Sequence, residues 1–300
     1  MELTNNDKQQ IANRLRLYVA KFASQNKAVA SMKGTSAGTV SNILNGKWDN
    51  ISEDMWRKVS DQVGLVNGSE KDWQVVETHA FHEITIAMKD AQTFKNVTWV
   101  VGEAGCGKTT TARIFGEENR EVYYILCSED LHKGDFVREI AHKMGIRTDG
   151  FTVRELWITI QNELIKMDAP LLVFDEADKL IESVFQYFIS LYNKIEDKCG
   201  VVFLSTDYIK TRIDRGLRCK KRGYKEFYSR IGRKYFELDD TTPHDVYAIC
   251  VANGLTDEKD INEVIAESNS CEYDLRRVKK SIHRIKRIKA IPQFGIRNSA

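Results

Sequence analysis

In the stretch Gly102-Glu103-Ala104-Gly105-Cys106-Gly107-Lys108-Thr109, the sequence matches the pattern GxxxxGK(S/T) at every fixed position. The glycines in this pattern let the backbone bend so that its N–H groups converge on phosphate groups. The stretch follows the apolar run Val97–Val101, which predicts a buried strand, and it opens a predicted helix over 108–117. Strand, glycine-rich loop and helix in this order predict a phosphate-binding P-loop at the N-terminus of a helix.

The residue types of this loop predict a nucleoside triphosphate with magnesium as the ligand. The ammonium group of Lys108 is expected to reach the β and γ phosphates, and the hydroxyl of Thr109 to bind Mg²⁺. The other residues of the loop, together with Thr110, are expected to contact the nucleotide. The predicted cofactors are therefore ATP and Mg²⁺.

Two carboxylates, Asp175 and Glu176, end a second apolar run, Leu171–Phe174. Asp175 is expected to hold Mg²⁺ through water, while Glu176 is expected to polarise the attacking water as a general base. The alternative for Glu176 is a solvated acid at the start of a helix. Because the P-loop pattern accompanies this pair, the sequence favours ATP hydrolysis over binding alone.

Beyond residue 81 the chain alternates between apolar runs and helical patterns. Strands are predicted at 97–101, 122–127, 171–174, 201–204 and 235–238, and helices at 108–117, 133–144, 152–167 and 179–196. This alternation predicts an α/β fold with a parallel sheet covered on both faces. After Asp239 only helices are predicted, near 243–253, 258–269 and 273–290. We therefore expect a core domain over 81–240, and a helical lid with a basic C-terminal helix over 241–300.

The first part of the chain predicts four short helices and no strand. A turn at Gly34 separates the second and third of them. Residues 27–46 resemble the helix-turn-helix of Cro/repressor-type regulators, and this resemblance implies DNA contacts from Thr39, Asn42 and Lys47. An ordinary helical interaction bundle is the alternative. We expect an all-α helix-turn-helix domain over 1–66, followed by a linker over 67–80.

The cysteines and the apolar runs bear on where the protein works. Six cysteines are scattered without CxxC spacing, which disfavours a zinc site and is typical of a reducing compartment. The first residues lack a signal-peptide pattern, and no apolar run approaches the roughly 20 residues that span a bilayer. We therefore expect a cytoplasmic protein with no membrane partner.

Positive charge collects in two late segments, although the formal net charge is only +2. Residues 212–234 hold ten Lys or Arg and two acids, a density that favours contact with the phosphates of nucleic acid. From Leu275 onward there is no acid at all. For this last segment, a DNA-contacting helix and a lid helix with a basic exterior remain equal alternatives.

The motifs together resemble those of the AAA+ ATPases over about 81–290. The sequence Asp-Glu-Ala-Asp at 175–178 resembles their Walker B motif, and residues 201–206 resemble sensor 1, with Thr206 near the γ-phosphate. Residues 273–277 resemble sensor 2, in which Arg276 would touch the nucleotide. A surface arginine is the alternative for Arg276.

Residues 227–231 resemble the box that carries the arginine finger, which implies that role for Arg230. Arg215 and Arg233 are rival candidates in the same basic stretch, and a surface arginine is again the alternative. An arginine finger acts on ATP held by the neighbouring subunit, so the resemblance implies an oligomer in which a monomer hydrolyses ATP slowly.

The layout of a helix-turn-helix, a compact AAA+ module and a short basic lid resembles the phage Mu B family of transposition proteins. That family polymerises on DNA with ATP, selects the target and activates the transposase. Its DNA contacts come from the loops after the second and third strands, where this sequence offers Lys133 and Lys179. The implied partners are double-stranded DNA, further copies of this chain in an oligomer or filament, and a transposase.

Three other functions remain open from the sequence. A helicase loader or replication initiator of the same superfamily has indistinguishable ATPase motifs. A DNA-binding regulator that uses ATP only as a switch needs no general base, so Glu176 disfavours it. A signalling ATPase whose N-terminal bundle binds protein is disfavoured by the basic segment 212–234.

Overall fold

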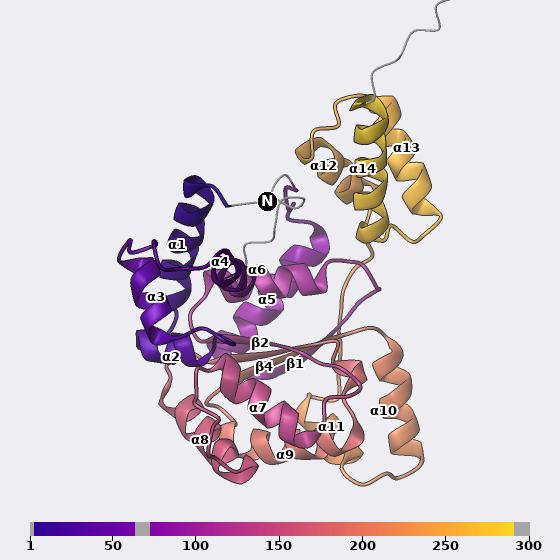
Figure 1. Ribbon diagram of the computed structural model, residues 1–300. Coiled ribbons are helices and arrows are strands. Elements are labelled where there is room, and N and C mark those ends of the chain that lie inside the picture. The colour runs from indigo at the N-terminus through magenta and orange to yellow at the C-terminus, as the bar shows by residue number, and fades with distance from the viewer. Residues whose placement is uncertain (1–2, 64–72, 291–300) are drawn as a thin grey trace, which may run out of the picture.

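The computed structural model describes residues 3–63 and 73–290, and its centre is a five-stranded sheet (Figure 1). The strands are β1 (Val97–Val101), β2 (Val122–Leu126), β3 (Leu171–Asp175), β4 (Gly200–Ser205) and β5 (Phe236–Glu237). They lie in the order β2-β3-β4-β1-β5, and every neighbouring pair is parallel. The expected α/β fold with a parallel sheet is therefore confirmed.

Helices cover both faces of the sheet (Figure 1). One face packs against α5 (His79–Phe94) and α6 (Lys108–Glu118). The other face is covered by α7 (Lys133–Lys143), α8 (Val153–Lys166), α9 (Glu182–Ile195), α10 (Tyr208–Arg218) and α11 (Tyr224–Arg230). Because β3 and β4 are covered on both faces, they are buried along their whole length, which explains their continuous apolar sequence. The loops at the carboxyl ends of the strands meet at one edge of the sheet.

The N-terminal helices surround a small core of their own, with Trp56 fully buried in it. They are α1 (Asn5–Ala20), α2 (Gln25–Ala30), α3 (Ala37–Leu44) and α4 (Glu53–Gln62). Each helix begins at a hydroxyl side chain that accepts a backbone N–H of its first turn; the four caps are Thr4, Ser24, Ser36 and Ser52. These caps fix where the short helices begin.

Charged side chains hold the N-terminal helices against the core. The ammonium group of Lys21 donates to the carbonyl of Gly116 on α6 at 2.9 Å, and Lys27 pairs with Glu163 on α8 at 2.7 Å. A Cβ atom at Gly145 would lie 2.2 Å from the carbonyl oxygen of Lys27, so the two backbones approach closely there. Polar side chains and close backbone packing therefore fix the position of the N-terminal helices on α6 and α8.

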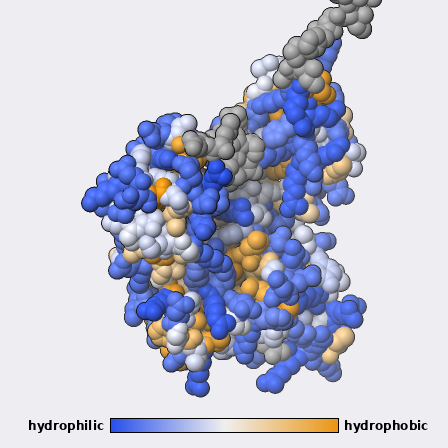
Figure 2. Space-filling model, in the orientation of Figure 1, coloured by the Kyte–Doolittle hydropathy of each residue, from blue (hydrophilic) through white to orange (hydrophobic). Residues whose placement is uncertain are grey.

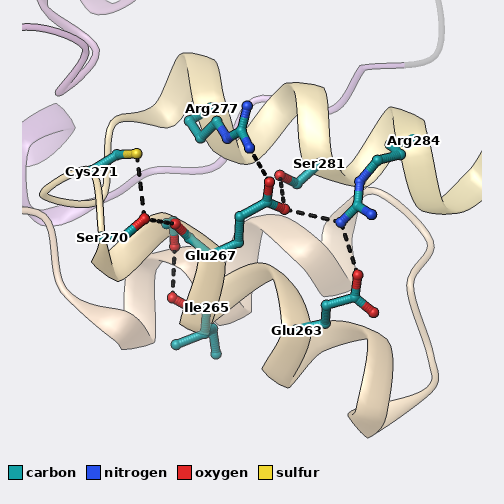
Figure 3. A network of polar contacts seen from close by, with 9 residues as sticks. Glu263, Ile265, Glu267, Ser270, Cys271, Arg277, Ser281 and Arg284 are labelled. Atoms are coloured by element: carbon teal, nitrogen blue, oxygen red, sulfur yellow. Dashed lines mark hydrogen bonds and ion pairs between the residues drawn. The ribbon is translucent and has the colours of Figure 1, made fainter.

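The lid consists of α12 (Pro243–Ala252), α13 (Glu258–Asn269) and α14 (Leu275–Ala290). Figure 3 shows that cations of α14 pair with acids of α13: Arg277 with Glu267, and Arg284 with both Glu263 and Glu267. A hydrogen bond from Ser281 holds the pKa of Glu267 below its ordinary value. Some of the basic side chains of α14 are thus paired with acids within the lid. This pairing favours the alternative that α14 is a lid helix with a basic exterior. Over the lid and the N-terminal helices, the face in Figure 2 is mostly hydrophilic.

The segment that leads into α5 is packed against the lid. The backbone N–H of Gln74 donates to the Asn253 side chain at 2.9 Å, and the Asn253 amide donates back to the Gln74 carbonyl at 3.0 Å. Trp73 and Val76 pack on the apolar core of the lid. In its described part, the expected linker 67–80 is therefore held by contacts with the lid and ends in the first turn of α5. The remainder of that linker lies outside the described residues.

Three helices, α5, α10 and α11, are absent from the sequence-based expectations. In α10 the apolar residues Ile209, Ile213 and Leu217 recur every four positions, but charged residues fill the gaps between them. α9 also begins later than expected, because a short 3-10 turn, Ala177–Lys179, follows β3. Within residues 3–63 and 73–290, no helix is long and apolar enough to cross a membrane.

Candidate active site

The loops at the carboxyl edge of the sheet enclose a cleft of about 620 Å³, a size suited to a nucleotide. The P-loop and the ends of β3 and β4 form its floor, and the segment 73–78 with the first turns of α14 closes it from the lid. The predicted site residues that line it are Ala104, Gly105, Gly107, Lys108, Thr109, Thr110, Asp175, Glu176, Thr206 and Arg276. Gly102, Glu103 and Cys106 belong to the same loop but do not line the cleft, and Cys106 is buried.

The backbone of the P-loop takes a conformation that glycine allows. Gly105 has φ +86° and Gly107 has φ +105°, and Gly107 caps the helix that begins at Lys108. The Lys108 ammonium donates to the carbonyls of Gly102 and Glu103 at 2.7 and 2.8 Å. The loop therefore presents a lysine and a helix N-terminus to the cleft, the two features that attract phosphate.

A hydrogen bond between two side-chain oxygens joins the P-loop to the end of β3. The hydroxyl of Thr109 donates to Oδ2 of Asp175 at 2.6 Å. Asp175 is only 2% exposed, and its Oδ1 accepts the backbone N–H of Glu176 at 2.9 Å. A hydroxyl and a carboxylate beside a phosphate-binding loop are the hard oxygen ligands that Mg²⁺ prefers. The residues at this position therefore fit Mg²⁺ bound together with nucleotide phosphates.

Glu176, the predicted general base, lines the cleft from a left-handed backbone conformation with φ +53°. Its carboxylate pairs with the ammonium of Lys179 at 2.7 Å. This hydrogen-bonded pair raises the pKa of Lys179. The carboxylate expected to accept a proton from water is thus engaged by a cation one turn later in the chain.

Thr206 is held by the loop that follows β3. Its hydroxyl donates to Oδ2 of Asp178 at 3.1 Å, and the backbone carbonyl of Asp178 accepts from Arg212 at 2.8 Å. The end of β4 is therefore fixed relative to the Walker B-like loop.

The two predicted arginines lie in different places. Arg276 lines the cleft, whereas the neighbouring Arg277 is paired with Glu267 inside the lid. Arg230 ends α11 and does not line the cleft of its own chain. Its guanidinium donates to Asn193 of α9 at 2.7 and 3.0 Å and lies over the Tyr192 ring. The structure therefore does not bring Arg230 to the other predicted catalytic residues within one chain.

Sequence reasoning misses one polar contact at the centre of the site. The hydroxyl of Tyr124, on β2, donates to Oδ2 of Asp175 at 2.8 Å. Burial and the charge of Asp175 raise the pKa of Tyr124, so its hydroxyl stays protonated and can donate. The only signal in the sequence is the pair Tyr123-Tyr124 inside an otherwise apolar run. Sequence reasoning also misses the part that segment 73–78 plays in lining the cleft.

The predicted DNA contacts fall into two groups on different parts of the fold. Asn42 and Lys47 are exposed at the end of α3, while Thr39 is partly buried and bonds to the hydroxyl of Ser36. Lys133 opens α7 after β2, and its ammonium lies 4.2 Å from the centre of the Tyr187 ring. Lys179 follows β3 and is paired with Glu176. Because β2 and β3 are neighbours, Lys133 and Lys179 belong to the same edge of the sheet.

Comparison with known proteins identifies the fold of the core. Residues 92–213 match the AAA domain family. The chain is similar to the ATP-dependent target DNA activator B proteins of Escherichia phages Mu and D108, with 24% identity over 254 residues in each case. Those alignments cover 82% of this chain and 78% of each relative.

A solved structure, that of the Aeropyrum pernix Orc1 protein in complex with DNA, resembles this chain with a TM-score of 0.50 and 17% identity. The match covers 73% of this chain but 63% of the Orc1 chain, less than two thirds of its length. At this identity the likeness concerns the fold alone.

Proposed function

We propose that this chain, which carries an AAA domain and resembles the target DNA activator B proteins of phages Mu and D108, hydrolyses ATP and assembles on double-stranded DNA. In this proposal it acts in the cytoplasm, serves transposition by selecting the target, and activates a transposase. The observation that carries the ATPase part is the convergence of Lys108, Thr109, Asp175 and Glu176 on one cleft.

The chemistry follows from these side chains. Bound Mg²⁺ would offset negative charge on the phosphates. Lys108 is placed to hold the β and γ phosphates, and Thr109 with Asp175 to hold the metal. Glu176 accepts the proton of the attacking water, and Thr206 is the polar residue near the γ-phosphate. Arg276 contacts the nucleotide from the lid.

Assembly follows from the position of Arg230. Because it does not line the cleft of its own chain, we assign it to the cleft of the adjacent subunit. DNA binding rests on Lys133 and Lys179, on the helix-turn-helix residues Thr39, Asn42 and Lys47, and on the exposed cations of α10, α11 and their flanking turns. Those cations are Arg215, Arg218, Lys220, Lys221, Arg222, Lys225, Arg233 and Lys234. A row of subunits repeats these contacts along one duplex, and avidity then turns weak contacts into stable binding.

A DNA titration in three nucleotide states tests this function. We expect affinity for duplex DNA to rise sharply with ATP and Mg²⁺ and to fall with ADP, with particle size rising in parallel. By linkage, DNA must also favour the ATP-bound assembly. Equal affinity and an unchanged monomer in all three states would leave an ATP-switched DNA-binding regulator as the better account. If assembly occurs but no transposase is activated, a helicase loader or replication initiator becomes the better account.

The ion pair between Lys179 and Glu176 predicts how the Lys179→Ala protein behaves. Loss of the pair frees the Glu176 carboxylate for water, so ATP turnover without DNA should rise about twofold to fivefold, the range typical of an exposed ion pair. Loss of a phosphate contact should at the same time weaken DNA binding. Phosphate release with and without duplex DNA measures both effects. The matched control is Lys143→Ala, which removes a similar ion pair with Glu139 on α7, away from the cleft. Unchanged turnover in Lys179→Ala would show that the pair does not restrain Glu176.

A further inference from the structure

The carboxylate of Asp175 is held by three donors, two of which meet at the same oxygen. Thr109 and Tyr124 both donate to Oδ2, at 2.6 and 2.8 Å, and the backbone of Glu176 donates to Oδ1. A buried carboxylate is stable only when such donors satisfy it. Tyr124 is the one donor of the three that belongs to neither of the motifs recognised in the sequence.

The sheet places Tyr124 at this position. β2 pairs with β3 so that Tyr124 lies opposite Val173 and Leu126 lies opposite Asp175. Tyr124 and Asp175 are therefore diagonal neighbours whose side chains share the face covered by α6. The guanidinium of Arg113 on α6 lies 5.7 Å from the centre of the Tyr124 ring and packs against it. The ring is thus held from both the sheet and the helix.

We propose that Tyr124 is a positioning residue that orients the Asp175 carboxylate for Mg²⁺. The inference rests on the proposed ATP and Mg²⁺ function. Mg²⁺ bound here would coordinate the Thr109 oxygen through a lone pair and leave its hydroxyl proton directed at Asp175, so the Tyr124 hydroxyl would be the second side-chain donor that fixes Oδ2. A phenol suits this role because it donates one hydrogen bond and adds no charge beside the metal. Partners of metal ligands of this kind typically contribute tenfold to a hundredfold to metal affinity.

The Tyr124→Phe protein tests the proposal, because it loses only the hydroxyl. Binding of a fluorescent ATP analogue is titrated with Mg²⁺, and is also measured in EDTA. We expect the Mg²⁺ midpoint to rise about tenfold, while binding without Mg²⁺ stays unchanged. The control is Tyr123→Phe, whose hydroxyl donates to the sulfur of Met167 at 3.4 Å and makes no contact with Asp175. Thermal melting without nucleotide shows how much each substitution affects folding.

A Mg²⁺ midpoint within twofold of the wild type in Tyr124→Phe overturns the proposal. An equal rise in both tyrosine variants also overturns it, because the effect then comes from packing of β2. Failure of the proposed function looks different: the wild-type protein itself then binds the analogue with no dependence on Mg²⁺.

Discussion

The Glu176→Gln protein will bind ATP as the wild type does and hydrolyse it at least about tenfold more slowly. The substitution keeps the shape of a side chain that lines the cleft but removes the proton acceptor, and general bases typically contribute 10²–10⁴-fold to rate. Lys108→Ala should instead abolish ATP binding, because the ammonium at the mouth of the P-loop is lost. Nucleotide affinity and steady-state turnover, measured for both proteins, separate the two roles.

Glu182→Gln is the matched control for this pair. Glu182 begins α9 shortly after the site, pairs with Lys221 at 2.9 Å and does not line the cleft. The Glu182→Gln protein should keep the wild-type affinity for ATP and the wild-type rate of ATP turnover. Near-normal turnover in Glu176→Gln would remove Glu176 from the role of general base and restore the alternative of a solvated acid.

The Arg230→Ala protein will bind ATP normally but lose DNA-stimulated turnover by at least about tenfold. Arginine fingers contribute up to 10³–10⁵-fold in other phosphoryl-transfer proteins, and here assembly on DNA is expected to deliver Arg230 to the next subunit. The contact of Arg230 with Asn193 and Tyr192 holds it on the outer side of α9 and α11, away from its own cleft.

Mixing two inactive proteins distinguishes action in trans from action in cis. Arg230→Ala subunits keep an intact cleft, and Glu176→Gln subunits keep an intact arginine, so mixed assemblies should regain turnover at a fraction of their interfaces. A mixture that stays inactive would place the arginine in the site of its own chain or outside catalysis. Arg215→Ala and Arg233→Ala, treated alike, decide between the three arginines.

The sheet could be predicted from the sequence because its strands are short, apolar and rich in β-branched residues. β1 has the predicted bounds, and β3 and β4 differ from theirs by one or two residues. The sequence did not predict α5, α10 and α11, and there is a physical reason in each case. α10 and α11 lie in the basic segment. Its many charged residues obscure the apolar periodicity of Ile213 and Phe227, which pack on the sheet. α5 precedes the first strand, in a part of the chain where strand and helix patterns do not yet alternate.

Within the site, sequence reasoning finds residues whose spacing is fixed along one loop and misses contacts that depend on the fold. Lys108 and Thr109 belong to a continuous motif and can be recognised from it. The contact of Tyr124 with Asp175 depends on β2 lying beside β3, which follows from strand order. Similarly, Lys179 was expected only to face DNA, and its pairing with Glu176 depends on the left-handed backbone of that residue.

The strand order has a consequence for how the protein is made. β1, which carries the P-loop, is the first strand to leave the ribosome, yet it lies between β4 and β5, which are synthesised last. It can take its place only after residues 200–237 have emerged, and such distant pairings form slowly. Until β4 has emerged, β1 has no strand to bond on either side, whereas the N-terminal helices already have a core of their own. In a growing chain, the N-terminal helices can therefore pack early, and the phosphate-binding loop takes its final position only when synthesis of the sheet is almost complete.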